Sequence, residues 1–209
     1  QMQEWLNSVI DRMPEFRMIV GKQQHGTHAY SVDFHTLNVL QKVVNNPSFG
    51  TLSDDGKKVL EYATLMHDFG KFGSQVTTGH ASISRQYAEQ ILSSSDLSLE
   101  VKRRILNLIE HHHWFEGYNK GITTARDFCR TFPNPEDRII AKIFAKAVNC
   151  LHPVNGEPCN ECEICKAMLD GSLTDVVEMD AASNNSVEDI RAIRDEVNFL
   201  PTVAKARVY

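Results

Sequence analysis

Residues that could bind metal ions gather in the first part of the chain, where eight of the nine histidines precede residue 114. His67 and Asp68 stand side by side after an apolar stretch, and His35 lies in an earlier apolar stretch. A mixture of imidazole and carboxylate suits first-row divalent ions such as Mn, Fe, Co, Ni or Zn, and suits Mg or Ca less well. His35, His67 and Asp68 are therefore candidate metal ligands.

The elements that carry these residues are predicted to be helices. Apolar residues recur at helical spacing up to about residue 148, without the alternation of a strand. The expected helices cover His35–Val44, a stretch starting at Ser53–Asp55 and ending before Gly70, Ala81–Leu92, Leu99–His113 and Glu136–Ala147. Adjacent helical residues point about 100° apart, so His67 and Asp68 reach one ion only where their helix becomes irregular. Gly70 supplies that irregularity.

Further histidines accompany this set. His80 follows a glycine, and His111, His112 and His113 form a triplet before a tryptophan. A single histidine on a helix is more often a core or surface residue than a ligand. The metal-site prediction therefore rests on all of these histidines and Asp68 taken together. The order and spacing resemble the HD superfamily of metal-dependent phosphohydrolases. The stretches Pro14–Phe16 and His28–Leu37 narrow the resemblance to the HD domain of uridylyltransferase/uridylyl-removing enzymes, over roughly residues 14–147.

The resemblance implies a role for each residue. His35, His67 and Asp68 would bind one ion, while His80 and either His111 or His112 would complete a second position. Because successive helical residues turn by about 100°, one or two histidines of the triplet must face elsewhere. Asp68, in contact with both ions, would position a metal-activated water for phosphoester hydrolysis. Lys71 would hold a phosphate oxygen, or would be a solvated lysine at a helix end.

One position departs from the resemblance. The family's last ligand is an aspartate at the end of the final helix, where this chain has Val148. A valine cannot bind a metal, so the site should be weakened while the fold survives. We therefore predict an HD-type domain over residues 1–148, with its hydrolase activity impaired.

A different kind of metal site follows. Cys150, Cys159, Cys162 and Cys165 have the spacing C-x8-C-x2-C-x2-C. Four thiolates at such spacing are typical of a tetrahedral structural zinc site, and free thiols in a loop are the alternative. The composition changes here, and residues 149–209 are predicted to form a zinc knuckle and a partial α/β segment. That segment would have a strand at Asp175–Asp180 and a helix at Ser186–Val197.

This second segment resembles the gamma/tau subunit of bacterial DNA polymerase III, the clamp-loader ATPase. The resemblance rests on Ala141–Cys150, the cysteine spacing and Asp180–Asn185, and covers about residues 141–209. The helix is preceded by Pro133-Asn-Pro-Glu-Asp, which has no glycine-rich phosphate-binding loop, and the Walker B strand would follow Tyr209. ATP binding and clamp loading are therefore not expected. A join between two sequences within Ala141–Ala147 would explain Val148.

Composition limits the class of protein. The 209 residues are 42% hydrophobic and 23% charged with a net charge of −5, and no apolar run approaches the ~18 residues of a membrane span. We expect a cytoplasmic protein with no membrane partner and with a phosphorylated small molecule or nucleotide as substrate. The alternatives are a non-catalytic metal- or nucleotide-binding regulatory module, or a gamma/tau fragment with DNA polymerase III partners.

Overall fold

The computed structural model describes residues 2–23, 30–71, 79–114, 125–150, 159, 161–162 and 165–166. Within this part of the chain every regular element is a helix, as predicted. The α-helices are α1 (Met2–Arg12), α2 (Val32–Val44), α3 (Asp54–Met66), α4 (His80–Ser93), α5 (Leu99–Glu110), α7 (Ala125–Thr131) and α8 (Pro135–Asn149), and the 3-10 turns are η1 (Pro14–Ile19), η2 (Pro47–Thr51) and η3 (Phe69–Lys71). The predicted strand at 175–180 and helix at 186–197 lie outside the described residues.

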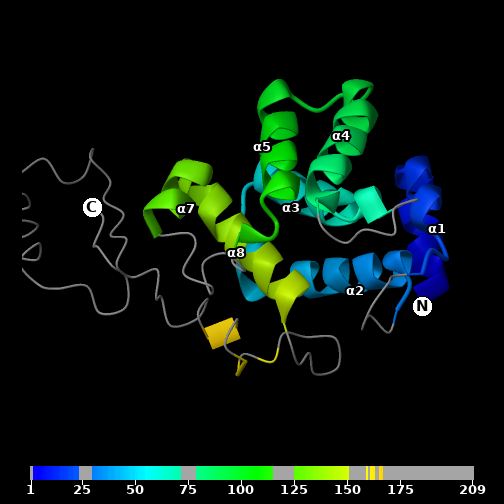
Figure 1. Ribbon diagram of the computed structural model, residues 1–209, viewed down its shortest axis with the longest axis horizontal. Coiled ribbons are helices and arrows are strands. Elements are labelled where there is room, and N and C mark those ends of the chain that lie inside the picture. The colour runs from blue at the N-terminus through cyan, green and yellow to red at the C-terminus, as the bar shows by residue number, and fades with distance from the viewer. Residues whose placement is uncertain are drawn as a thin grey trace, which may run out of the picture.

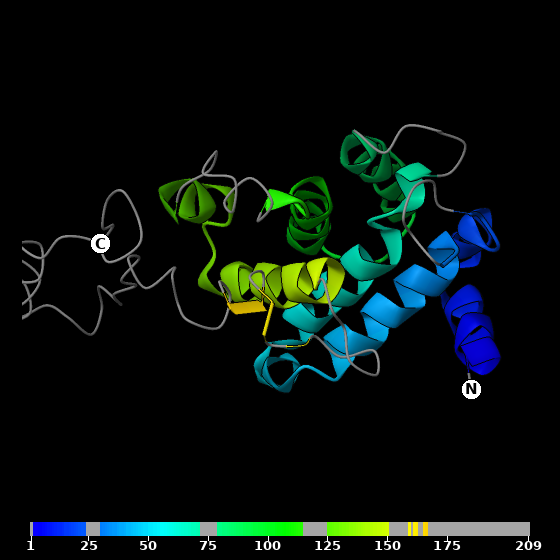
Figure 2. The same ribbon diagram turned by 60° about the horizontal axis from the view of Figure 1, so that its bottom comes forward.

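Helix α3 is the centre of the bundle. It packs against α2, α4, α5 and α8. Helices α4 and α5 form a hairpin on one side of it, with α2 on the other (Figure 1). Turning the molecule shows α8 running beside α2 and α3 (Figure 2). The core between these helices includes the fully buried side chains of Phe16, Leu60, Phe69, Ile105 and Phe144, and each such burial contributes about 1.5–3 kcal/mol.

The helix starts follow the capping chemistry of the sequence. Ser53 precedes α3, as predicted, and Ser98 precedes α5; each side chain accepts a hydrogen bond from the backbone N–H three residues on. Asn134 caps α8 in a similar way, and Pro135 takes the first helical position, where its missing N–H costs nothing.

The helix ends bring the chemistry-bearing residues together. Helix α3 ends at Met66, so His67 and Asp68 lie in a turn before η3. The irregularity expected at this point is confirmed. Because the regular α-helix does not continue through these residues, the two neighbouring side chains can point to one place.

The predicted extent of α5 is wrong. It ends at Glu110, and His111 to His113 lie in a turn instead of continuing the helix to His113. The His112 Nδ1 lies 2.6 Å from the carbonyl oxygen of Ile109 and satisfies one of the acceptors that a helix end leaves unpaired. The rule of 100° per residue therefore does not apply to the triplet, and two of its members can face one site.

A charged network fixes α8 on the bundle. Glu136 accepts hydrogen bonds from the backbone N–H of Ser53 at 2.7 Å, from the Ser53 hydroxyl at 3.0 Å and from Arg104 at 2.7 Å. Arg104 Nε also donates to Asp137 at 2.7 Å. These bonds tie the start of α8 to the start of α3 and to α5. At the other end of α8, Lys42 Nζ donates to the carbonyl of Ala147 at 3.4 Å.

Glu136→Gln is expected to lower the free energy of unfolding by about 1–2 kcal/mol at neutral pH, because charge-assisted hydrogen bonds are stronger than neutral ones. Burial raises the pKa of Glu136, but the bonds from Ser53 and Arg104 outweigh burial and the pKa lies below its usual value. A depressed folded-state pKa gives stability that is present above the unfolded pKa of about 4.3 and is lost as the pH falls below it.

Urea unfolding at pH 7 and below pH 4 measures this effect. The gap between wild type and Glu136→Gln should be wide at pH 7 and should close in acid. Glu100→Gln is the matched control, since Glu100 pairs with Arg103 on an exposed surface and such pairs contribute little. Equal stability of Glu136→Gln and wild type at pH 7 would contradict the prediction.

Candidate metal centre

Asp68 lies among three imidazoles, two of them beside one carboxylate oxygen and the third beside the other. Oδ2 is 3.3 Å from His67 Nε2 and 3.6 Å from His35 Nε2. Oδ1 is 3.3 Å from His80 Nε2. The Asp68 side chain is only 1% exposed, so this carboxylate is positioned by the protein and not by solvent.

His67 presents a bare nitrogen to this carboxylate. Its Nδ1 lies 2.7 Å from the carbonyl oxygen of Thr64, which can only accept a hydrogen bond, so Nδ1 carries the proton. Nε2 is buried and has no hydrogen-bond partner. A lone pair thus faces a carboxylate oxygen at 3.3 Å. Such a contact is unfavourable unless positive charge lies beside the carboxylate, as a bound cation or an ammonium group would provide.

Three more imidazole nitrogens meet on the other side of Asp68. His80 Nε2 lies 3.1 Å from His112 Nε2 and 3.2 Å from His113 Nε2. The Ile109 carbonyl holds the proton of His112 on Nδ1, which leaves a lone pair on Nε2. A single N–H on His80 Nε2 can point to only one of the two neighbouring nitrogens. A cation can bind the Nε2 atoms of all three histidines at once.

The distances fit coordination shells. Ligands about 2.0–2.1 Å from a tetrahedral ion lie roughly 3.3–3.4 Å apart. Five pairs of neighbouring nitrogen and oxygen atoms in this cluster are separated by 3.1–3.6 Å. Each group of three residues, His35–His67–Asp68 and His80–His112–His113, offers ligand atoms that all lie within 4.8 Å of one another. The residues therefore fit two neighbouring ion positions that share Asp68.

Protonation favours metal binding as well. Burial lowers the pKa of His67 and lowers that of His112 well below its usual value. Burial would raise the pKa of Asp68, but His67, a hydrogen bond from His80 and the charge of Lys71 outweigh burial and hold it well below its usual range. Neutral imidazoles and an ionised carboxylate are the forms that bind metals.

Lys71 already brings one positive charge to the cluster. Its Nζ lies 2.8 Å from Asp68 Oδ2, and its side chain is 17% exposed. The residue follows Asp68 by three positions in η3, so the short 3-10 turn carries the ammonium back to the carboxylate. The sequence suggested a phosphate-binding lysine or a solvated one, and the structure shows a lysine paired with a candidate ligand.

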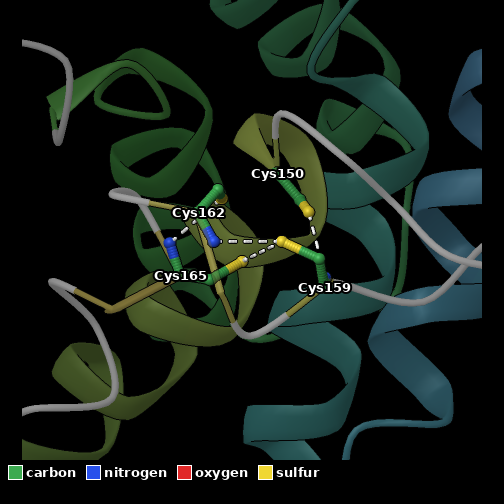
Figure 3. Close-up of side chains that lie close together, drawn as sticks. All are labelled: Cys150, Cys159, Cys162 and Cys165. Carbon is green, nitrogen blue, oxygen red and sulfur yellow. Dashed lines mark hydrogen bonds between the residues drawn. The ribbon is translucent and has the colours of Figure 1, made fainter.

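The four cysteines predicted to bind zinc also converge, at the end of α8 (Figure 3). Their sulfur atoms lie within 4.8 Å of one another, and all four are free of disulfide bonds. Sulfurs bound at about 2.3 Å to a tetrahedral zinc would lie about 3.8 Å apart. The Cys159 and Cys165 sulfurs are 4.0 Å apart, so the described geometry fits such a site.

Backbone N–H groups point at these sulfurs, as they would at thiolates. The N–H of Cys159 donates to Cys150 Sγ at 3.2 Å, and that of Cys162 donates to Cys159 Sγ at 3.2 Å. Hydrogen bonds from the backbones of Glu161 and Cys162 lower the pKa of Cys159 to about 6. The thiolate is the form that binds metal.

A cavity of about 720 Å³ lies elsewhere, along α4, α5 and α7. Its lining carries both signs of charge, including Arg85, Glu89, Lys102 and Arg130, and contains none of the histidines of the cluster. Mixed charge of this kind indicates no single class of ligand, and the candidate chemistry stays with Asp68.

Comparison with known proteins assigns the helical part. The family model described as "HD domain" matches residues 34–167, well over half of the chain. The chain belongs to the HD-domain family. This HD domain contains His35, His67, Asp68 and the further histidines on the helix ends where the structure brings them together. No solved structure matches the chain.

The C-terminal part matches a different group of proteins. The family model described as "DNA polymerase III, delta subunit" matches residues 134–209. The DNA polymerase III subunit tau of Bacillus subtilis is 59% identical over 69 residues, which are 33% of this chain and 12% of that protein. The subunit tau/gamma of Haemophilus influenzae is 49% identical over 70 residues, covering 34% of this chain and 10% of that protein.

A longer alignment reaches into the helical part. The DNA polymerase III subunit gamma of Buchnera aphidicola is 28% identical over 124 residues, which are 59% of this chain and 31% of that protein. The chain thus spans between about a tenth and a third of these relatives. The two family models overlap over residues 134–167, which include α8 and the cysteines. The chain is an HD domain followed by a clamp-loader-like fragment. None of the described helices is long and apolar enough to cross a membrane.

The structure distinguishes the members of the histidine triplet within the HD domain. His112 is in the cluster, and so is His113, which the sequence did not single out. His111, named as a possible ligand, is outside the cluster, and its ring lies 6.2 Å from that of Phe132. Treating the triplet as helical concealed this difference. Three consecutive histidines at a helix end are the signal that could have pointed to two members of the cluster.

Helix α8 covers the HD cluster with hydrocarbon. The Phe144 ring lies 5.3 Å from that of His67 and 6.3 Å from that of His112. Val148 follows Phe144 by one helical turn, so it lies on the same face, and it packs partly buried against the core. The position where the HD resemblance expects an aspartate thus contributes apolar packing.

Proposed function

We propose that the HD domain is a metal-dependent phosphohydrolase that acts on a phosphoester or nucleotide-type substrate. The observation that carries the proposal is the position of Asp68, one of whose oxygens faces His67 and His35 while the other faces His80. Hydrogen bonding alone gives no reason to bury so many nitrogen lone pairs beside one carboxylate. Membership of the HD-domain family supports the same conclusion.

The residues of the chain have distinct parts in this proposal. A divalent ion would supply positive charge for the phosphate oxygens and would lower the pKa of water. The imidazoles and Asp68 hold the ion, and the carbonyls of Thr64 and Ile109 fix the tautomers of His67 and His112. Lys71 adds an ammonium that would attract the phosphate oxygens. His35 is 22% exposed, so substrate would approach from the side of His35 and Lys71.

Two adjacent histidines provide a matched test. His112→Ala is expected to lower the hydrolysis of bis(p-nitrophenyl) phosphate by at least roughly 100-fold, since loss of an outer partner of a metal ligand alone costs about 10–100-fold. His111→Ala changes the same residue type at the neighbouring position outside the cluster, and is expected to leave the rate nearly unchanged. Initial rates with added Mn²⁺ or Co²⁺ measure both variants.

The result also distinguishes catalysis from other roles. Equal losses of hydrolysis in the two variants would mean that the substitutions act by disturbing the fold and not by removing a member of the cluster. Bound metal without turnover in the wild type would favour the regulatory, non-catalytic module.

A second candidate function is association with DNA polymerase III subunits. The 59% identity to the tau subunit of Bacillus subtilis over 69 residues favours it. Co-purification of the full chain with DNA polymerase III subunits tests it, and a chain lacking residues 150–209 should then lose the association. Hydrolysis of ATP is not part of this proposal, because α8 is preceded by Phe132-Pro-Asn and not by a glycine-rich loop.

A further inference from the structure

The two ion positions that share Asp68 are not equivalent. We call His35, His67 and Asp68 Oδ2 the aspartate–lysine half, because Lys71 contacts that oxygen. We call His80, His112, His113 and Asp68 Oδ1 the three-histidine half. The difference between them lies in the number of donors and in the charge already present.

The three-histidine half offers three imidazole nitrogens and a carboxylate oxygen beside one of them. His112 and His113 both approach His80 Nε2, within 3.2 Å, and Asp68 Oδ1 lies 3.3 Å from the same atom. The three imidazole nitrogens lie within 4.8 Å of one another, and together with Asp68 Oδ1 beside His80 they would provide the four ligands of an ion such as zinc or cobalt. His112 is 3% exposed and His80 4%, so packing against the protein holds both imidazoles in place.

The aspartate–lysine half has fewer metal-binding atoms, and the Lys71 ammonium already contacts one of them. The Lys71 ammonium lies 2.8 Å from Asp68 Oδ2 and is mostly sheltered from solvent. An ion bound to this oxygen would lie within a few ångströms of the ammonium and would be repelled by it. The face of α8 above His67 presents Phe144, and one turn later Val148, neither of which can add a ligand or balance the charge.

We propose that the centre holds one divalent ion, in the three-histidine half, and that the Lys71 ammonium supplies the positive charge of the aspartate–lysine half. Three nitrogen donors select zinc, cobalt or nickel over magnesium for this ion. The inference rests on the proposed metal centre and specifies its stoichiometry and ligands. It also assigns His113, in place of His111, to the ligand set.

Cobalt binding to the full chain tests the proposal. Equilibrium dialysis against Co²⁺ with elemental analysis counts the ions, and absorption spectra separate them, because only cysteine-bound cobalt gives sulfur-to-metal charge transfer. Wild type is expected to bind two ions, one at the cysteines and one with a nitrogen-rich spectrum. Three ions would overturn the proposal, as would a single ion with the cysteine spectrum.

Lys71→Met tests the role of the ammonium. The variant keeps an unbranched side chain that is one atom shorter, removes the charge and is expected to bind one ion more than wild type. Val148→Asp provides a second route, because a carboxylate on the same face of α8 would offset the charge of Lys71, and it should also add one ion. Lys58→Met, which alters an exposed lysine of α3, is the control and should bind two. No added ion in either Lys71→Met or Val148→Asp would refute the part given to Lys71.

Failure of this inference can be told from failure of the proposed function. Hydrolysis by a chain that binds three cobalt ions would leave the function standing and overturn the stoichiometry. Two bound ions of the expected kinds without hydrolysis of any phosphoester would leave the stoichiometry standing and overturn the proposed function.

Discussion

Asp68→Asn is expected to abolish the histidine-bound ion and to lower hydrolysis by roughly 10³-fold or more, in the range found when a preorganised electrostatic partner is removed from an active site. The amide has nearly the shape of the carboxylate but lacks its charge. It would leave the Lys71 ammonium without the partner that lies 2.8 Å away. It would also present to His67 and His80 either an N–H or a weaker oxygen, and the shared ligand of the centre would be lost.

Metal content and initial rates measure this prediction together. The cobalt count per chain should fall by one, with the cysteine-bound ion retained. Asp137→Asn is the matched control, since Asp137 is a buried aspartate paired with Arg104, away from the cluster. That variant should lose stability and keep its metal and its rate per folded molecule. A fully active Asp68→Asn chain would exclude the proposed chemistry.

Local chemistry made most of the helix starts predictable. Ser53 begins α3 because its hydroxyl accepts from a backbone N–H that would otherwise have no partner, and that preference is readable in the sequence. The end of α5 was not readable in this way. There the His112 imidazole turns back to the Ile109 carbonyl and its Nε2 meets His80 of α4, and this second contact, between distant parts of the chain, is not contained in propensity or periodicity.

The site was predictable in part for the same reason. Residue types and family resemblance pointed to His35, His67 and Asp68, which the structure brings together. The choice within the histidine triplet required the geometry of a turn. The contact between Lys71 and Asp68 required η3, since a regular α-helix and a 3-10 turn carry a side chain three residues on to different places.

Helix α8 is where the two resemblances meet. Both family models include it, and Glu136 at its start is bonded to Ser53 of the HD body. The helix is continuous from Pro135 to Asn149, so the predicted join within Ala141–Ala147 would lie inside one element. A shared amphipathic helix permits such a join, because its apolar face can complete one core while its end leads into a different segment. The boundary at residue 148 remains a prediction.

Gly70→Ala is expected to destabilise the fold by about 3 kcal/mol, at the upper end of the usual cost of overpacking a core. A Cβ at this position would lie 2.3 Å from the carbonyl oxygen of His80 and 2.8 Å from the backbone nitrogen of Ser84. Backbone atoms cannot move aside as the end of a flexible side chain can. Gly70 also donates its N–H to the Ser84 hydroxyl at 2.8 Å, so η3 and α4 would have to separate.

The glycine thus has a function beyond ending a helix, because separation of α4 would move His80 out of the cluster. Urea unfolding and the cobalt count measure the two consequences, and both should fall in Gly70→Ala. Gly50→Ala is the control, since a Cβ there meets nothing within 4 Å, and it should unfold and bind cobalt like wild type. If Gly70→Ala kept the stability and the histidine-bound ion of wild type, the close approach of η3 to α4 would not be what positions His80.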